Sequence, residues 1–222
     1  MIFQTYPSRD ALMAGLAATI AAELRAALTQ GPATLSVPGG TTPGPVFDAL
    51  SATDLDWSRV AVLLNDERWV GSDSPRSNTR LLRERLLINQ AAAATLIPLY
   101  AEAPQPEDKL AELSLAIAPH LPISVLLLGM GADMHTASLF PGADKLAQAL
   151  APDAPILLAL RAQAAGEPRI TLSARVLNAA QHIHILITGP DKRDALNRAL
   201  TLTPTEAPVR VVLNQATVHW AE

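Results

Sequence analysis

Short apolar runs alternate with helical stretches along most of the chain, and this alternation constrains the fold more than any other feature. The runs typical of buried strands are 33–37, 60–64, 96–99, 123–128, 156–160 and 182–188. Stretches typical of helices flank them at 9–29, 43–50, 78–87, 107–118 and 191–200. Strands that read as continuous apolar runs belong to parallel sheets with helices on both faces. The sequence therefore predicts an α/β fold with a mostly parallel sheet.

The chain reads as one domain. In its first helix an apolar residue recurs every fourth position from Leu12 to Leu28, the pattern of an amphipathic helix, and Gly31-Pro32 stops it. The Pro-containing segments 101–106 and 151–155 are too short to be interdomain linkers. A length of 222 residues with 49% hydrophobic content suffices for a full core. We therefore expect residues 1–222 to form a single α/β domain.

Charge, cysteine content and the N-terminus narrow the classes of function. The formal net charge of −4 gives no general attraction to nucleic acid or to anionic membranes, so we expect neither as a partner. The absence of cysteine excludes disulfides, thiolate metal sites and thiol nucleophiles. The first ten residues lack the pattern of a signal peptide, and the apolar runs read as too short to span a bilayer. We expect a cytoplasmic protein.

A glycine-rich loop follows the first apolar strand. Ligands of open α/β sheets bind beyond the carboxyl ends of the strands, and this loop reads Pro38-Gly39-Gly40-Thr41-Thr42-Pro43. The glycines let the backbone approach an anion, and a helix that starts at Pro43 with Thr42 as its cap points free amides at the same spot. The loop therefore favours a phosphate, although a plain strand-to-helix turn fits the same pattern. It is not a Walker loop, because no Lys follows the glycines.

A polar segment follows the second buried strand. It reads Asn65-Asp66-Glu67-Arg68, and Ser77-Asn78 comes at the start of the next helix. Arg68 suits bidentate binding of a phosphate or carboxylate, while Asp66 and Glu67 suit hydrogen bonds from sugar hydroxyls. A solvated loop with an internal ion pair is the alternative interpretation.

The most apolar strand, 123–128, runs into the turn Gly129-Met130-Gly131-Ala132-Asp133-Met134-His135. This turn predicts Asp133 and His135 at the mouth of the sheet. Histidine is the side chain most easily tuned to accept a proton near neutral pH, and a nearby carboxylate orients it. A strand-end turn with a surface histidine is the alternative. A dinucleotide fingerprint is disfavoured, because Met134 stands where a third small residue is needed.

Two later segments offer cations, and the remaining histidines do not suggest a metal. Arg169 and Lys192 follow apolar stretches and suit a phosphate. The other histidines lack both neighbouring carboxylate clusters and the spacing of zinc ligands: His120, His182, His184 and His219. We expect no metal site.

Together, these segments resemble the 6-phosphogluconolactonase family, which belongs to a superfamily with glucosamine-6-phosphate deaminases and ribose-5-phosphate isomerases. The resemblance spans nearly the whole chain, and its most diagnostic piece is His135-Thr136-Ala137-Ser138-Leu139-Phe140-Pro141-Gly142. In the deaminases the sequence after the shared histidine is different, so this motif favours a lactonase. The resemblance implies a three-layer, Rossmann-like α/β sandwich. It also implies hydrolysis of 6-phospho-D-glucono-1,5-lactone to 6-phospho-D-gluconate, in the oxidative pentose phosphate pathway, with neither a metal nor a cofactor.

The resemblance also assigns roles to residues. His135 is expected to be the general base that activates water, and Asp133 to position it or the sugar. The expected substrate- and phosphate-binding residues are Gly39, Gly40, Thr41, Thr42, Asp66, Arg68, Asn78, Arg169 and Lys192. Whether Arg68 contacts the phosphate or the sugar ring stays open. The implied partner is a small sugar-phosphate lactone, with the chain a monomer or a small homo-oligomer.

One departure from the family pattern concerns the catalytic turn. The family usually has Asp-Gly-His, and here the middle residue is Met134. If the glycine normally holds a positive φ angle, methionine at this place costs on the order of 1 kcal/mol. Two alternatives to a lactonase stay open: a deaminase or sugar-phosphate isomerase on the same fold, and, because of Met134, a sugar-phosphate-binding module without catalysis.

Overall fold

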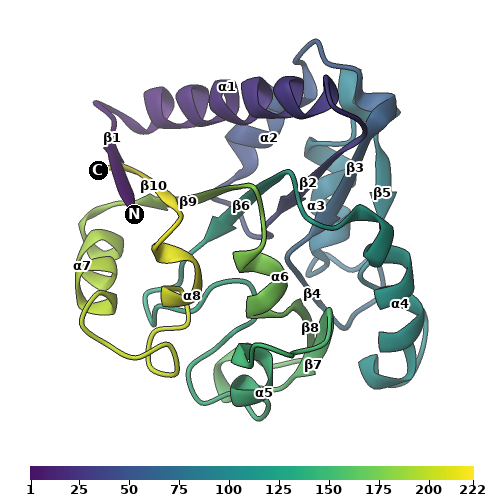
Figure 1. The fold of residues 1–222 in the computed structure, drawn as a ribbon, viewed down its shortest axis with the longest axis vertical. Coiled ribbons are helices and arrows are strands. Elements are labelled where there is room, and N and C mark those ends of the chain that lie inside the picture. Colours follow the sequence, from purple (N-terminus) through teal and green to yellow (C-terminus); the bar gives the residue numbers. More distant parts are fainter.

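The computed structural model describes residues 1–222, apart from the side chain of Ala164. Its main sheet has seven strands, all parallel, in the order β1-β10-β9-β6-β2-β3-β5 (Figure 1). Their bounds are β1 Ile2–Thr5, β2 Ala33–Val37, β3 Val60–Leu64, β5 Thr95–Ile97, β6 Val125–Gly129, β9 His182–Thr188 and β10 Thr217–Ala221. The prediction of a mostly parallel sheet is confirmed.

Helices cover both faces of this sheet. In Figure 1, α1 and α2 lie on one side of the strands, and α6 and α8 lie on the other. The helices are α1 Arg9–Leu28, α2 Gly44–Ser51, α3 Asn78–Arg85, α4 Leu110–Ile117, α5 Leu146–Leu150, α6 Ala174–Asn178, α7 Pro190–Ala199 and α8 Arg210–Leu213. The helix predicted at 107–118 is divided, because the 3₁₀ turn Pro106–Lys109 precedes α4.

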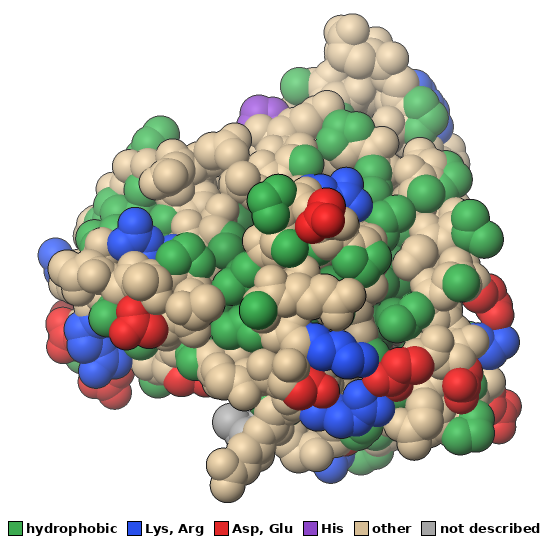
Figure 2. All heavy atoms as spheres, turned by 60° about the horizontal axis from the view of Figure 1, so that its bottom comes forward, with side chains coloured by type: hydrophobic (Ala, Val, Ile, Leu, Met, Phe, Trp, Pro, Cys, Tyr) green, Lys and Arg blue, Asp and Glu red, His purple; other side chains and the backbone are tan. Residues whose placement is uncertain are grey.

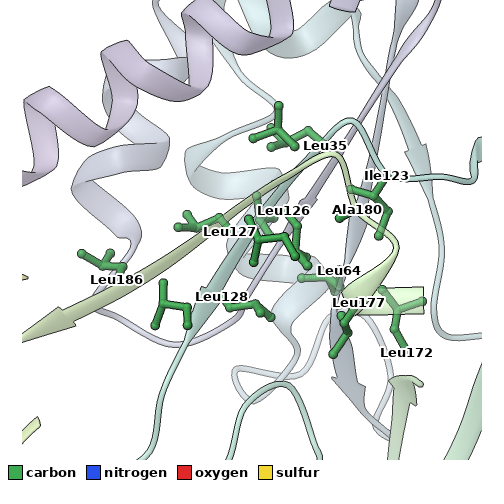
Figure 3. Packing of buried hydrophobic residues seen from close by; sticks show 14 of the residues in the cluster. Leu35, Leu64, Ile123, Leu126, Leu127, Leu128, Leu172, Leu177, Ala180 and Leu186 are labelled. Atoms are coloured by element: carbon green, nitrogen blue, oxygen red, sulfur yellow. The ribbon is translucent and has the colours of Figure 1, made fainter. Parts of the chain in front are cut away.

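The centre of the core is β6, whose first four residues are buried. Figure 3 shows Leu126, Leu127 and Leu128 of this strand together with leucines of the two neighbouring strands, Leu35 of β2 and Leu186 of β9. Burying each leucine stabilises the fold by about 1.5–3 kcal/mol relative to leaving it in water. The strand that leads to the predicted catalytic turn is therefore firmly held.

Helix α1 begins where the sequence predicts and packs its apolar stripe inward. Ser8 caps it by accepting a hydrogen bond from the backbone amide of Ala11 at 3.2 Å. Its length and mean hydropathy would suffice to cross a membrane, so the expectation that no apolar run is long enough is wrong on those two criteria. Its buried residues instead form part of the core: Leu12, Met13, Leu16, Ala17, Ile20, Ala21, Leu24 and Leu28.

A second, antiparallel sheet corrects two sequence interpretations. It has the order β4-β8-β7, with β4 at Asp66–Arg68, β7 at Leu157–Leu160 and β8 at Arg169–Leu172. The run 156–160 therefore does not belong to the main sheet, and Asp66–Arg68 of the polar segment 65–68 forms a strand rather than a solvated loop. Asn65 joins β4 directly to β3, and its carbonyl accepts a hydrogen bond from Leu172 at 2.9 Å. The small sheet is thus fixed to the carboxyl end of the main one.

The sequence prediction also missed the strands at the two ends of the chain, β1 and β10. Strand β1 pairs with β10, so the N- and C-termini lie close together (Figure 1). Strand β10 is almost wholly buried, but Thr217 and His219 interrupt its apolar residues, so it is not a continuous apolar run. It follows α8, so 191–200 is not the last helix.

Candidate active site

A cavity of about 400 Å³ opens at the carboxyl ends of β2, β6 and β9. Its wall contains most of the residues that the sequence predicted for the site: Gly39, Gly40, Thr42, Asp66, Arg68, Asn78, His135, Arg169 and Lys192. Thr41 and Asp133 lie outside the wall, although Asp133 contacts His135. The structure therefore brings together segments that are more than 150 positions apart in sequence, which is what a common ligand requires.

The pair of Asp133 and His135 is formed within the turn after β6. The Nδ1 atom of His135 lies 2.5 Å from Oδ1 of Asp133. The imidazole ring also packs against Phe140, and the two ring centroids are 4.3 Å apart. The hydrogen bond to His135 lowers the pKa of Asp133 below its ordinary value. A carboxylate at Nδ1 holds that nitrogen as the donor and leaves Nε2 as the proton acceptor.

The backbone of this turn restricts which residues can stand at positions 131 and 134. Met134 has φ +66°, so it occupies the left-handed region in which glycine carries no steric cost. Gly131 must lack a side chain, because a Cβ atom there would clash with His135 and Asp133. The turn is closed by a hydrogen bond from the amide of Gly131 to the carbonyl of His135 at 2.9 Å, and Val209 donates to the carbonyl of Met134 at 3.1 Å. The left-handed position considered from the sequence is confirmed.

Glu67 organises the wall of the cavity without lining it. It is fully buried, and its carboxylate accepts hydrogen bonds from the backbone amides of Arg68 and Asn78 at 2.8 Å and of Thr79 at 2.7 Å. Ser77 donates its hydroxyl at 3.1 Å. A carboxylate at a helix N-terminus satisfies free amides and matches the helix dipole. The suggestion that Glu67 binds sugar hydroxyls is therefore wrong, and its role is to fix β4 against α3.

Asp66 and Asn78 are held by local contacts at the cavity wall. The hydroxyl of Ser138 donates to Oδ2 of Asp66, and Nη1 of Arg169 lies 3.8 Å from the same oxygen. Asn78 donates from Nδ2 to the carbonyl of Asp66 at 3.1 Å. A Cβ atom at Gly39 would clash with the amide of Asn78, so this glycine is what lets the loop after β2 approach α3.

Arg68 and Arg169 lie side by side, because they are register partners in the pairing of β4 with β8. Burial lowers the pKa of Arg169, the charges of Arg68 and Arg76 lower it further, and the carboxylate of Asp66 opposes the shift. The Nε atoms of Arg68 and Arg169 are both buried and have no hydrogen-bond partner among the described residues. Two buried donors of this kind on a cavity wall suit an anion with several acceptor oxygens.

The glycine loop and Lys192 complete the wall. Helix α2 has no side-chain cap, so the predicted capping role of Thr42 is wrong, and Thr41 and Thr42 are both exposed. Lys192, in the first turn of α7, donates to the carbonyl of Met130 at 3.0 Å. This contact holds the ammonium group close to the turn that carries His135.

The sequence analysis missed some residues of this region. Phe140 and Ser138 lie in the lactonase-type stretch but received no role, and their contacts with His135 and Asp66 depend on how the chain folds back after the turn. Glu167 was not singled out, because its ion-pair partner Arg76 lies 91 positions away and no local pattern links them.

The other histidines lie away from the cavity wall. His184 and His219 are buried in contact with each other, whereas His182 is half-exposed. Across the described part of the chain, no group of three or more His, Cys, Asp or Glu side chains is arranged to hold a metal ion.

Known proteins share both the sequence and the fold. A family model described as glucosamine-6-phosphate isomerases/6-phosphogluconolactonase matches residues 7–220. A 6-phosphogluconolactonase of Mesorhizobium japonicum is 44% identical, with 99% of this chain and 94% of that protein covered. One from Pseudomonas aeruginosa is also 44% identical, covering 93% and 89%. The crystal structure of a 6-phosphogluconolactonase from Shewanella baltica superposes with a TM-score of 0.96 at 34% identity, over 100% of this chain and 98% of that one. The chain therefore belongs to the glucosamine-6-phosphate isomerase/6-phosphogluconolactonase family.

Proposed function

We propose that this protein hydrolyses 6-phospho-D-glucono-1,5-lactone to 6-phospho-D-gluconate in the oxidative pentose phosphate pathway, with residues 1–222 acting as one catalytic unit. The observation that carries the proposal is a single cavity wall that holds His135, paired with Asp133, together with the cations Arg68, Arg169 and Lys192. The relatives that match nearly the whole chain bear the name of this enzyme, which supports the same activity here.

The proposed chemistry begins at His135. Its Nε2 takes a proton from water as the water oxygen forms a bond to C1 of the lactone, and Asp133 stabilises the resulting imidazolium through Nδ1. When the tetrahedral intermediate collapses, the bond between C1 and the ring oxygen breaks. The protonated His135 then returns its proton to that oxygen. The product is an open-chain acid, and the histidine is regenerated without a metal or a cofactor.

The phosphate on C6 lies far from C1 and serves as the anchor. Arg68, Arg169 and Lys192 supply positive charge to it, and the exposed loop with Gly40 and Thr42 supplies backbone amides and a hydroxyl. Binding energy from such a remote group fixes the orientation of the reacting carbonyl. The anchor therefore also distinguishes the phosphorylated lactone from the free one.

The alternatives receive less support. A deaminase or isomerase on this fold would share the Asp133–His135 turn, but the relatives that match most of this chain are named as lactonases. A binding module without catalysis was suggested by Met134. The turn around Met134 nevertheless keeps the contact between Asp133 and His135, which favours an active enzyme.

The distribution of surface charge bears on the partners of the protein and on its location in the cell. On the face that Figure 2 shows, Lys and Arg side chains lie beside Asp and Glu side chains, so this face has no broad patch of one sign for a polyanion. We therefore propose a cytoplasmic enzyme, monomeric or a small homo-oligomer, whose partner is the sugar-phosphate lactone rather than nucleic acid or a membrane.

A direct assay tests the activity. The lactone is generated in situ by oxidation of glucose 6-phosphate, and its disappearance is followed with and without the protein. We expect a rate well above spontaneous hydrolysis. If the protein gives no acceleration but binds 6-phosphogluconate, it is a binding module; if it releases ammonia from glucosamine 6-phosphate, it is a deaminase.

Substitutions separate the roles of base and anchor. We expect His135→Ala to lower kcat by about 10²- to 10⁴-fold with little change in KM, because it removes proton transfer but not the phosphate anchor. Lys192→Ala and Arg169→Ala are expected mainly to raise KM. Steady-state kinetics on the purified variants measures both effects. Wild-type turnover in His135→Ala would exclude the histidine as the base.

A further inference from the structure

Glu167 connects two segments that border the cavity. Its carboxylate forms an ion pair with Arg76, which lies in the segment between β4 and α3, while Glu167 itself lies just before β8. The carbonyl of Arg76 in turn accepts a hydrogen bond from Nη1 of Arg68 at 2.8 Å. The backbone amide of Trp69 donates to the carbonyl of Pro168 at 2.8 Å, which joins the same two segments a second time. Glu167 thus acts on Arg68 through Arg76, and it is not part of the cavity wall.

The burial of Glu167 is unusual for a carboxylate that lies outside the cavity wall. Its side chain is only 11% exposed, whereas that of its partner Arg76 is 59% exposed. One oxygen of Glu167, Oε1, is buried without a hydrogen-bond partner among the described residues and lies 3.9 Å from the equally unpaired Nε of Arg68. A buried carboxylate is costly unless nearby charges compensate it. Its electrostatic partners here are the two arginines, so its position depends on both.

Glu167 offsets the repulsion among the positively charged side chains around it. Arg68, Arg76 and Arg169 are three guanidinium groups in one region, and the charges of the first two lower the pKa of Arg169. Asp66 lies next to Arg169 at 3.8 Å, and Glu167 lies next to Arg68 and Arg76. Without Glu167, the repulsion between Arg68 and Arg169 would be opposed by Asp66 alone. The remaining repulsion from Arg169 would then favour a conformation in which the side chain of Arg68, already 32% exposed, turns toward solvent.

We propose that Glu167 is a positioning residue, which holds the guanidinium of Arg68 at the cavity wall, directly and through Arg76, in the orientation that receives the phosphoryl group of the ligand. This role rests on the proposed function insofar as the ligand is a sugar phosphate. It goes beyond that function by assigning part of the phosphate affinity to a carboxylate that does not touch the phosphate.

The test is the substitution Glu167→Gln, which keeps the size of the side chain and removes its charge. The dissociation constant of inorganic phosphate, measured by calorimetry, is expected to rise by about 3- to 10-fold, the range for losing part of one charge-assisted contact. In lactone hydrolysis KM is expected to rise by a similar factor, while kcat stays within about twofold, because the turn that carries His135 is not altered. The control Glu84→Gln breaks the exposed ion pair of Arg80 and Glu84 and is expected to change neither constant.

A second substitution checks that the effect runs through Arg76. Arg76→Gln alone should raise the phosphate dissociation constant, and the double variant with Glu167→Gln should be no worse than the more affected single variant. Unchanged phosphate affinity in Glu167→Gln would overturn the proposal. Tighter binding would overturn it too, because it would mean that Glu167 only competes with the phosphate for the arginines.

The two proposals can fail separately. If the wild-type protein does not hydrolyse the lactone but its phosphate affinity depends on Glu167, the proposed function fails and the positioning role stands. If the lactone is hydrolysed and Glu167→Gln behaves like the wild type, the function stands and the positioning role fails. Thermal unfolding of each variant identifies a general loss of structure, and Glu167→Asp, which keeps the charge, should then restore part of the phosphate affinity.

Discussion

Met134 holds a backbone conformation that is unfavourable for an L-amino acid, at the residue between the proposed base and its carboxylate partner. Its φ angle of +66° is costly by about 1–2 kcal/mol for residues other than glycine. Its side chain, however, packs against the core, which offsets part of that cost. The structure thus shows how the turn keeps its geometry without the usual glycine, because packing and the hydrogen bond from Val209 stabilise the left-handed residue.

Comparing two substitutions at this position isolates the backbone cost. Met134→Ala and Met134→Gly both remove the packing, but only glycine relieves the strain. We therefore expect the glycine variant to be more stable than the alanine variant by about 1 kcal/mol in urea denaturation. At Ala18, an exposed position within α1, the order is expected to reverse, with Ala18→Gly costing about 1 kcal/mol. An alanine variant at Met134 as stable as the glycine variant would contradict the strain.

At the scale of elements, the N-terminus of α3 depends on one buried carboxylate. Glu67 accepts hydrogen bonds from three backbone amides and from the Ser77 hydroxyl, and a glutamine cannot accept all of them because its amide nitrogen is a donor. We expect Glu67→Gln to lower the free energy of unfolding by about 3 kcal/mol, since hydrogen bonds to a charged group are lost and buried amides are left unsatisfied. Chemical denaturation measures this loss.

The matched control for Glu67 is the cap of the same helix. Ser77 accepts a hydrogen bond from the amide of Arg80 at 3.3 Å and donates to Glu67 at 3.1 Å, so Ser77→Ala removes the cap and one of the four hydrogen bonds of Glu67 but keeps the carboxylate. It is expected to be less harmful than Glu67→Gln, at about 1 kcal/mol. Equal losses in the two variants would mean that the carboxylate of Glu67 has no special role in holding α3.

The elements that the sequence predicted well are those with a strong local signal. The repeat of apolar residues in α1 and the continuous apolar run of β6 each specify one kind of structure by themselves. Strand β4, with Asp66 and Arg68, carries no such signal, because it is polar and only three residues long. It forms because β8 pairs with it, and that pairing joins residues about a hundred positions apart. Short strands of this kind follow from tertiary contacts rather than from local preference.

The same distinction holds for the site. The Asp133–His135 pair lies within three residues, so the turn after β6 predicts it. The glycine loop and Lys192 follow from the rule that ligands bind beyond the strand ends. The contact of Arg68 with Arg169 and the ion pair of Arg76 with Glu167 depend on the small antiparallel sheet, which the sequence did not indicate.

At the scale of the whole molecule, a buried chain of polar groups joins the two ends of the sequence. The hydroxyl of Tyr6 lies 2.8 Å from Nδ1 of His219, whose Nε2 lies 2.9 Å from Nδ1 of His184. His184 contacts Glu23 of α1 at 2.7 Å, and the half-exposed His182 lies 3.4 Å from the same carboxylate. These contacts tie β9 and β10 to α1 and to the segment after β1. Because His219 is a buried histidine in this chain of contacts, the stability of the fold depends on the protonation of His219.

The shifted pKa of His219 predicts how the stability of the fold changes with pH. Burial, together with the neighbouring His184, lowers the pKa of His219 from 6.5 to about 4, although Glu23 acts in the opposite direction. Between these two values the unfolded chain binds the proton and the folded chain does not, so the stability is fully present above pH 6.5 and is lost as the pH falls toward 4. The contribution of His219 lost between pH 7 and pH 5 is about 2 kcal/mol.

The substitution His219→Gln removes this titration while keeping a side chain that can hydrogen bond. We expect the variant to be less stable than the wild type at pH 7, but its free energy of unfolding should fall by about 2 kcal/mol less on acidification to pH 5. Urea denaturation at both pH values measures the difference, and His120→Gln controls for loss of a histidine outside the chain of contacts. If His219→Gln loses as much stability on acidification as the wild type does, then His219 is not held neutral in the folded protein, and the acid sensitivity of the fold arises elsewhere.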